Sequence, residues 1–505
     1  MIPEPWEGRT PTIDTNQTES GSTVSETTTS LGKIRGTDSG GIERYWGIRF
    51  AEPPVGERRF APTVRSGGWD GTYDATAYAN RAIQPPMAEI FGPPGPGLPD
   101  EDCLFLNVFT PAADDAARPV MVWVHGGSYT TGSGNDYDAS VLARQGDVVV
   151  VTVNYRLGVF GFLDLSSLGE QFAGSASNGF RDQIAALEWV HDHIADFGGD
   201  PSNVTIFGES AGAGSVLALL ASPSAEGLFH KVIAHSPGGV NTAPVDFLSP
   251  LTAKLDDRGD GSVIDRLRAL TAEKLLELQL AVAFNGGDID GVVVTRHPTV
   301  AAGERGIPLI VGSNADEGTL FSSALAAMPE VFKLVSRMVA GQVVRGADPA
   351  ALLQALRDAY PQDSDVQIYE KVWVDLFRRA AVETAAAATD SGAGGWLYRF
   401  DVPTSIVGGK LGATHACEIA FTFNWFDAGG AGLVMHERSE ENIQLARRWS
   451  ATVAAFARAG DPNGAGLPDW PQYSSDDRRC LILDSECRVE TDPDAEHRKI
   501  WDDAS

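Results

Sequence analysis

Short apolar runs alternate along the chain with longer segments in which apolar residues recur at helical spacing. Buried strands are predicted for the runs Val120–Val124, Asp147–Val153, Val204–Phe207, Ile307–Ser313 and Trp396–Phe400. Between Asn178 and Ile194 apolar residues recur every three or four positions, which predicts an amphipathic helix. Strands and helices in this order indicate an α/β domain whose mostly parallel sheet carries helices on both faces.

Composition divides the chain into two parts. Residues 1–29 are rich in Thr, Ser, Glu and Gly and lack an apolar pattern, which predicts a flexible N-terminal extension or a poorly ordered edge. Residues 30–505 are expected to form a single domain. Within it, Gln84–Asp100 is rich in Pro and Gly and should be a long loop. Residues 320–390 should form a helical insertion over the active site rather than a second domain.

The charge of the chain excludes several classes of partner. Its 39 basic residues are outnumbered by 68 acidic ones, which gives a formal net charge of −29. A nucleic-acid-binding surface needs clustered Lys and Arg, and anionic membranes repel such a chain. We therefore expect no nucleic-acid partner and no membrane association. No feature of the sequence calls for an obligate protein partner.

The cysteines and the N-terminal residues bear on the cellular compartment in which the protein is expected. The four cysteines, Cys103, Cys417, Cys480 and Cys487, form no C-x-x-C pair and are too few for a disulfide scaffold. A hairpin turn at Asp484-Ser485 would place Ile482 opposite Cys487, so Cys480 and Cys487 should not be bridged. Four free thiols are expected. No signal-peptide pattern and no spanning apolar run is present, so a cytoplasmic protein is predicted.

The segment Gly208-Glu209-Ser210-Ala211-Gly212 matches the G-x-S-x-G pattern of a nucleophile elbow. A strand of β-branched and aromatic residues precedes it, and a helix of small residues follows it. A sharp turn between these elements would expose the Ser210 hydroxyl, and the glycines would leave room for the neighbouring strand and helix. This context predicts a serine hydrolase of the α/β-hydrolase fold with Ser210 as its nucleophile.

An activated serine also needs an oxyanion hole, an acid and a base, and candidates for each are present. Upstream, the strand Val120–Val124 runs into a Gly-rich loop, His125-Gly126-Gly127-Ser128-Tyr129. Downstream, Asp316 and Glu317 follow the strand Ile307–Ser313, and either could be the acid. The histidines beyond them are His415, His436 and His497. Because His436 lies among charged residues and His497 in a polar tail, His415 is the best candidate for the base.

Several long motifs resemble the type-B carboxylesterase and cholinesterase family, most of all its bacterial members described as para-nitrobenzyl esterases. The match covers nearly the whole chain from about Leu31, and its motifs follow one another in the family's order. They are GIRFAEPPVGERRFAP (47–62), EDCLFLNVFTP (101–111), VMVWVHGGSY (120–129), NYRLGVFGF (154–162), FGGDPSNVTIFGESAG (197–212), SNADEGTLF (313–321) and GATHACEIAFTF (412–423).

The resemblance implies a role for individual residues. Ser210 would be the nucleophile, Glu317 rather than Asp316 the acid, and His415 the base. Three N–H groups would form the oxyanion hole, those of Gly127, Ser128 and Ala211. Glu209 would be a buried carboxylate beside the nucleophile and Ser236 a hydroxyl near the triad. The pairs Arg59–Glu101 and Arg156–Asp182 would be structural ion pairs.

The sequence departs from the family pattern at three positions. Cys103 lacks the cysteine partner that the family usually supplies from the preceding loop. Ser128 replaces the more frequent third glycine of the oxyanion loop, which should narrow the acyl side of the pocket slightly. Leu320 stands where cholinesterases carry an aromatic residue that grips choline, so acetylcholine specificity is not expected.

Together these features predict hydrolysis of uncharged small-molecule carboxylic esters through an acyl-enzyme on Ser210, without metal or organic cofactor. Cleavage of a lactone, carbamate or activated amide by the same triad is an alternative. A non-catalytic binding protein of the cholinesterase type is a remote one. Leu320, Phe321 and the Pro-rich loop around Met87–Phe91 are candidates for the lining of the substrate pocket.

Overall fold

The computed structural model describes residues 23–86, 94–238, 245–255, 261–282, 284, 286–344, 348–428 and 435–504. Within these ranges, a sheet of 13 strands runs in the order β1-β2-β3-β7-β9-β8-β10-β11-β12-β13-β14-β15, with β4 paired to β2. Strands β5 and β6 form a separate pair. The strands are β1 (Thr23–Thr29), β2 (Gly32–Ser39), β3 (Ile42–Arg49), β4 (Thr72–Asp74), β5 (Arg81–Ala82), β6 (Pro99–Asp100), β7 (Phe105–Thr110), β8 (Arg118–Val124), β9 (Val149–Val153), β10 (Gly199–Glu209), β11 (Lys231–His235), β12 (Leu309–Asn314), β13 (Gly395–Phe400), β14 (Arg479–Leu483) and β15 (Arg488–Thr491).

The centre of the sheet is parallel and its edges are antiparallel. Strands β9, β8, β10, β11, β12, β13 and β14 pair in parallel, whereas β1, β2, β3 and β7 on one side and β15 on the other pair antiparallel. The central strands are almost wholly buried because helices cover both faces. The carboxyl ends of β8, β10, β11 and β12 therefore meet along one edge, where ligand sites of α/β proteins form.

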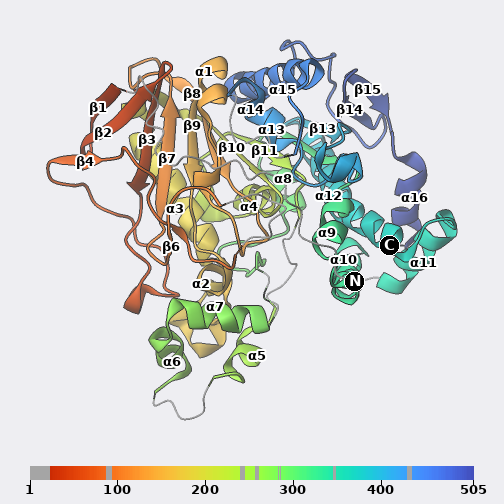
Figure 1. Ribbon diagram of the computed structural model, residues 1–505, viewed down its shortest axis with the longest axis horizontal. Coiled ribbons are helices and arrows are strands. Elements are labelled where there is room, and N and C mark those ends of the chain that lie inside the picture. Colours follow the sequence, from red (N-terminus) through yellow and green to blue (C-terminus); the bar gives the residue numbers. More distant parts are fainter. Residues whose placement is uncertain are drawn as a thin grey trace.

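Helices cover the two faces of the sheet in separate clusters (Figure 1). On one face α3, α4, α8 and part of α12 contribute to the core, and on the other α1, α13, α14 and α15 do so. The helices are α1 (Ser140–Gly146), α2 (Gly158–Phe162), α3 (Asn178–His193), α4 (Ala211–Leu220), α5 (Leu248–Thr252), α6 (Val263–Ala269), α7 (Ala272–Ala281), α8 (Pro298–Glu304), α9 (Gly318–Ala324), α10 (Pro329–Val344), α11 (Pro349–Ala359), α12 (Asp365–Asp390), α13 (Ile419–Thr422), α14 (Trp425–Ala428), α15 (Glu440–Ala459) and α16 (Ala495–Ala504).

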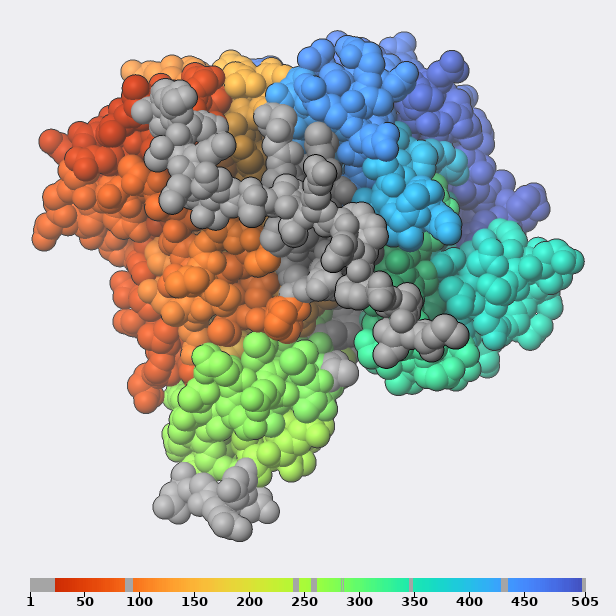
Figure 2. All heavy atoms as spheres, viewed as in Figure 1, coloured from red at the N-terminus to blue at the C-terminus, as the bar shows by residue number. Residues whose placement is uncertain are grey.

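Two groups of helices extend beyond these layers. Helices α5, α6 and α7 project at one end of the molecule, as Figure 2 shows in green. Helices α10, α11 and α12 share a small apolar core that also takes in Ile500 of α16. The prediction of an α/β-hydrolase fold with a mostly parallel sheet and a helical region over 320–390 is thus confirmed. No helix in the described ranges is both long and apolar enough to cross a bilayer.

The predicted flexible extension is wrong for residues 23–29. These residues form β1, which pairs with β2 in an unbroken antiparallel register from Thr23↔Asp38 to Thr29↔Gly32. The segment is almost wholly polar, and its one apolar residue, Val24, is exposed, because it lies at the edge of the sheet, where β-branched threonine suits an extended backbone. The rest of the proposed extension, residues 1–22, lies outside the described residues.

The C-terminal hairpin has a different register from the one expected. Ile482 pairs with Arg488 rather than Cys487, and Cys480 pairs with Glu490, so residues 484–487 form the connection between β14 and β15. Cys480 is a buried residue of β14, whereas the Cys487 thiol donates to the carbonyl oxygen of Asp484 at 3.3 Å. All four cysteines are unpaired in the structure.

Thiol titration of the protein denatured without reductant should therefore count four reactive groups. In the native protein, burial raises the pKa of all four thiols, but Cys487 is only half-buried, whereas Cys103, Cys417 and Cys480 are fully buried. These three thiols should therefore react far more slowly than Cys487. A count of two after denaturation would contradict the unpaired arrangement.

Candidate active site

Ser210 lies at a sharp turn between the end of β10 and the start of α4. Its backbone has φ 57° and ψ −123°, a conformation that is costly for a residue with a Cβ atom. A Cβ at Gly208 would lie 2.6 Å from the carbonyl oxygen of Val124, and one at Gly212 would overlap the same oxygen. Both glycines of the G-x-S-x-G pattern are therefore required by the close approach of β8.

Strand β11 holds the other side of this turn. The N–H of Ser210 donates to the carbonyl oxygen of His235 at 2.9 Å, and Ser236 follows directly, at φ 50°. The His235 ring is buried, and its Nδ1 lies 2.7 Å from the hydroxyl of Tyr398. Burial lowers the pKa of His235 to about 3, so its ring is neutral. His235 thus supports the turn and is not available as a base.

The predicted oxyanion loop leaves the end of β8 and lies against the elbow. A Cβ at Gly126 would lie 3.1 Å from the Cβ of Ser210, so the loop backbone approaches the nucleophile closely. Gly127 and Ser128 have φ of 106° and 54°. Within the described ranges, no residue accepts a hydrogen bond from the N–H of Gly127, Ser128 or Ala211. Three such donors beside one serine could stabilise a negatively charged oxygen.

Glu317 and His415 are in direct contact, as the family resemblance implies. Nδ1 of His415 lies 2.6 Å from Oε2 of Glu317, and both side chains are buried. The other oxygen of Glu317 accepts hydrogen bonds from the hydroxyl of Ser236 at 2.5 Å and from the N–H of Asn314 at 2.7 Å. The carboxylate is therefore held in one orientation toward the imidazole.

Asp316, the competing candidate for the acid, points elsewhere. Its Oδ2 accepts a hydrogen bond at 3.0 Å from the N–H of Ala413, and its own N–H donates to the carbonyl oxygen of Ala413 at 2.9 Å. Asp316 thus fastens the segment that carries His415 to the end of β12 without touching the imidazole itself.

Glu209 lies beside the other nitrogen of His415 at ion-pair distance, although the two facing atoms are not aligned as a hydrogen bond. Its Oε1 lies 3.0 Å from Nε2, the nitrogen that a base would turn toward the serine. Among the described residues no hydrogen bond joins the hydroxyl of Ser210 to His415. Catalytic hydrogen bonds often form only once substrate is bound, so this arrangement is compatible with a resting site.

Three buried carboxylates surround the imidazole, and they set its charge. Burial lowers the pKa of His415, but the negative charges of Glu209 and Glu317 outweigh it and the net shift is upward. Burial raises the pKa of Glu209 and of Glu418, the third carboxylate. Glu418 accepts a hydrogen bond from the side chain of Asn314 at 2.6 Å. Glu418 was not among the residues predicted from the sequence, although an acidic residue inside the apolar run after His415 is a usable signal.

Aromatic rings contact the imidazole on its remaining side. The ring of Phe377 on α12 stacks on His415 with centroids 4.5 Å apart, and Phe321 on α9 lies 5.1 Å from it. Trp373 stacks on Phe321 at 3.9 Å. Phe321 thus lies beside His415, whereas Leu320 is buried; their role in lining the substrate pocket stays a prediction. The predicted pocket segment Met87–Phe91 lies outside the described residues.

The structure corrects the interpretation of the other two histidines. His436 is buried, with its Nε2 2.9 Å from the carbonyl oxygen of Cys417 and its ring edge-on to Phe421. His497 lies on α16, where it contacts the buried carboxylate of Asp375 and the hydroxyl of Tyr360. Polar neighbours in the sequence suggested a solvated position, but rings of the preceding helices α13 and α14 contact His436, and residues of the distant α12 and of the end of α11 contact His497.

The two expected ion pairs are present away from the site. Arg156 binds Asp182 through two hydrogen bonds of 2.8 Å in the protein interior. Arg59 binds Glu101, with one contact of 2.7 Å, and also donates to the carbonyl oxygen of Leu270 at 2.6 Å. The second bond fastens the projecting helices to the sheet domain. Within the described ranges, no group of three or more His, Cys, Asp or Glu side chains is arranged to bind a metal ion.

A family model described as "Carboxylesterase family" matches residues 23–501. The chain belongs to this carboxylesterase family. It is 38% identical over 491 residues to the para-nitrobenzyl esterase of Bacillus subtilis, covering 94% of this chain and 97% of that protein. It is 34% identical over 492 residues to the human cocaine esterase, covering 89% and 85% of the two chains.

Solved carboxylesterase structures agree with the architecture described above. A carboxylesterase from Geobacillus stearothermophilus at pH 6.2 superposes with a TM-score of 0.81 at 35% identity, over 94% of this chain and 99% of the other. A PNB esterase structure gives a TM-score of 0.82 at 35% identity, over 95% and 99%. This carboxylesterase is therefore a serine carboxylic ester hydrolase that acts on small-molecule esters.

Proposed function

We propose that the chain hydrolyses uncharged carboxylic esters through an acyl-enzyme on Ser210, with His415 as base and Glu317 as the acid that orients it. The observation that carries this assignment is the 2.6 Å contact between Glu317 and His415 beside a serine in the elbow conformation. The N–H groups of Gly127, Ser128 and Ala211 are assigned to the oxyanion hole because they lie free next to that serine.

The first half-reaction forms the acyl-enzyme. Nε2 of His415 exchanges its contact with Glu209 for one with the hydroxyl of Ser210 and takes its proton as the oxygen attacks the ester carbonyl carbon. The carbonyl oxygen becomes an oxyanion in the proposed hole. The carbon–oxygen bond to the alcohol then breaks, and the departing alkoxide takes the proton from His415. Glu317 stabilises the imidazolium that exists between these two steps.

The second half-reaction releases the acid. A water molecule attacks the acyl carbon while its proton passes to Nε2 of His415, and the oxyanion forms again at the same three N–H groups. Collapse of this intermediate breaks the bond to Ser210, whose oxygen recovers the proton from His415. Protons and bonds balance without a metal ion or organic cofactor, so EDTA should leave activity unchanged.

The charge of the molecule and the aromatic rings support an uncharged substrate. A net charge of −29 repels an anionic ester before it reaches the site. Phe321, Phe377 and Trp373 offer apolar surface beside His415.

The proposal also includes the predicted location and partners of the protein: it is cytoplasmic and has no obligate protein partner.

A matched pair of chromogenic esters tests the substrate class. Para-nitrophenyl butyrate and para-nitrophenyl hemisuccinate have acyl groups of similar length but differ by one negative charge. We expect a kcat/KM at least about 10-fold higher for the butyrate, with the difference shrinking as salt is added. Equal turnover of the two esters at low salt would contradict the preference. No turnover of either, or of a wider panel of neutral esters, would contradict the proposed function.

The pH dependence of kcat/KM should report the charge of Glu209. The reaction needs neutral His415, so activity is lost as the pH falls through the pKa of that imidazole. Glu209→Gln removes a negative charge 3.0 Å from Nε2 and thus lowers the pKa of His415. The acidic limb of the profile should move to lower pH by about 1–3 units.

The variant Glu418→Gln is the matched comparison, because Glu418 is a buried carboxylate that raises the pKa of His415 less than Glu209 does. Its acidic limb should move in the same direction by a smaller amount. A profile of Glu209→Gln that coincides with the wild type, or moves to higher pH, would rule out the assigned contact.

A further inference from the structure

The side chain of Arg378 reaches from the middle of α12 to the end of β12. The proposed triad acid, Glu317, follows shortly after that strand end. Its guanidinium is buried and makes three contacts. Nε donates to the hydroxyl of Ser313 at 3.2 Å, and Nη2 donates to the carbonyl oxygen of Asn314 at 2.9 Å. Nη1 lies 2.9 Å from Oδ2 of Asp494. One cation thus binds the backbone of the segment that leads into Glu317.

Asn314 transmits this restraint to the proposed triad. Its own N–H donates to Oε1 of Glu317 at 2.7 Å, in the peptide unit next to the carbonyl that Arg378 holds. Its side-chain NH₂ donates to the carbonyl oxygen of Thr414 at 2.9 Å, the residue before His415. The orientation of the Asn314 backbone therefore bears on both the acid and the base.

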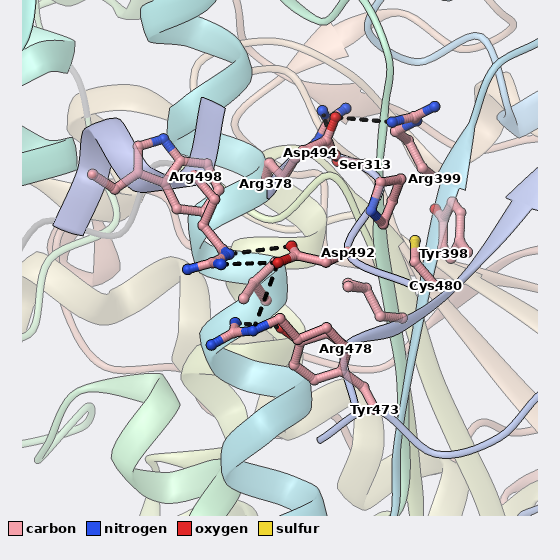
Figure 3. A pocket seen from close by; sticks show the side chains of 14 residues that line it. Ser313, Arg378, Tyr398, Arg399, Tyr473, Arg478, Cys480, Asp492, Asp494 and Arg498 are labelled. Carbon is pink, nitrogen blue, oxygen red and sulfur yellow. Dashed lines mark hydrogen bonds and ion pairs between the residues drawn. The ribbon is translucent and has the colours of Figure 1, made fainter. Parts of the chain in front are cut away.

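Asp494 fixes the orientation of Arg378 from the C-terminal part of the chain. It directly precedes α16, and its two oxygens bind two different arginines, Arg378 at 2.9 Å and Arg399 at 2.8 Å (Figure 3). A second aspartate in the same segment, Asp492, binds Arg498 at 2.8 Å. The start of α16 is thereby tied to α12 and β13 by buried or half-buried ion pairs.

We propose that Arg378 and Asp494 form a positioning pair that holds Asn314, and through it Glu317, in the orientation that serves His415. The inference rests on the proposed function, since it assigns a role only if Glu317 is the triad acid. Neither Arg378 nor Asp494 touches the reacting atoms. The packing of α16, which lies more than a hundred residues beyond the acid, is thereby needed for the correct orientation of Glu317.

The fork of an arginine side chain explains why this residue type stands here. Three acceptors in different directions, a hydroxyl, a carbonyl and a carboxylate, need donors on several nitrogens of one rigid plane. A lysine would keep the charge but could not satisfy all three acceptors in this geometry. An unpaired guanidinium at this depth would be costly, which accounts for the carboxylate of Asp494 beside it.

The variant Arg378→Gln tests the proposal in the full-length enzyme. We expect kcat per active site to fall by about 10- to 100-fold with little change in KM, because the acid is misplaced while the ester pocket is intact. The number of active sites is counted by burst titration or organophosphate labelling. The acidic limb of kcat/KM should also move to lower pH, since a misaligned Glu317 stabilises the imidazolium of His415 less. Arg378→Lys should recover part of kcat.

The matched control is Arg399→Gln. Arg399 shares Asp494 with Arg378, but its other partner is Asp401 rather than the Asn314 backbone. This control should lose thermal stability to a similar extent and keep kcat per active site. An equal fall in kcat for both variants, or an unchanged kcat and pH profile for Arg378→Gln, would overturn the proposal.

Asp494→Asn covers the case in which Arg378→Gln does not fold. Asp494 is partly exposed, and asparagine retains its shape, so this variant should fold and show a smaller fall in kcat with the same shift of the pH limb. A wild-type kcat and pH profile for Asp494→Asn would count against the pair. A failure of the proposed function would be seen in a different variant. If Ser210 is not the nucleophile, Ser210→Ala retains activity, whatever the effect of Arg378→Gln.

Discussion

The variant Ser210→Ala should lose about 10⁴- to 10⁶-fold in kcat toward a neutral para-nitrophenyl ester, because no other group can form the acyl-enzyme. The residual rate should stem from substrate binding and the oxyanion hole. An organophosphate should label the wild-type protein once, at Ser210, and should fail to label the variant. Mass spectrometry of the labelled peptide identifies the site.

Ser215→Ala is the matched control for this loss. Ser215 is a buried serine on the same helix, α4, whose hydroxyl accepts a hydrogen bond from Gln183 at 3.1 Å. Removing that hydroxyl should lower stability slightly and leave kcat and labelling close to the wild type. Near-normal activity of Ser210→Ala with a soluble, folded protein would refute the assigned nucleophile.

The second large effect is expected for the triad acid. Glu317→Gln should lower kcat by about 10³- to 10⁴-fold, because an amide neither fixes the tautomer of His415 nor stabilises the imidazolium. In the wild type, one oxygen of Glu317 accepts hydrogen bonds from the hydroxyl of Ser236 and the N–H of Asn314. An amide NH₂ at that position would meet two donors and have no acceptor. Steady-state kinetics on the same neutral ester measures the loss.

Asp316→Asn is the neighbouring control. Asparagine can still accept the hydrogen bond from Ala413, so the segment that carries His415 stays in place. Most of kcat should therefore be retained, and the contrast between the two adjacent carboxylates is the decisive quantity. A larger loss for Asp316→Asn than for Glu317→Gln would reverse the assignment of the acid.

The sequence by itself determined the features that depend on short stretches of chain. Apolar runs placed β8, β9, β10, β12 and β13 within two residues at their carboxyl ends, because buried strands of an α/β sheet need a continuous apolar segment. They did not predict the parallel strands β11 and β14. The elbow around Ser210 was readable because its strained turn demands glycines at fixed offsets, and those residues stand next to each other in the sequence.

Choices between neighbouring candidates needed more than local pattern. Asp316 and Glu317 both follow β12, and their spacing alone left the acid open. The family resemblance favoured Glu317, and the tertiary structure places that side chain, not Asp316, against His415. Two side chains that are adjacent in a turn point in very different directions. The residue types alone do not tell which of the two points toward His415.

Only the tertiary structure decided which polar side chains are buried together. His436 and His497 have polar sequence neighbours, yet His436 is buried against α13 and α14 and His497 contacts Asp375 of α12. Glu209 meets Nε2 of His415, and Arg378 meets Asp494, across more than a hundred residues of chain in each case. Such contacts depend on how whole elements are placed. The free energy of a buried charge is set by the groups around it in space rather than along the sequence.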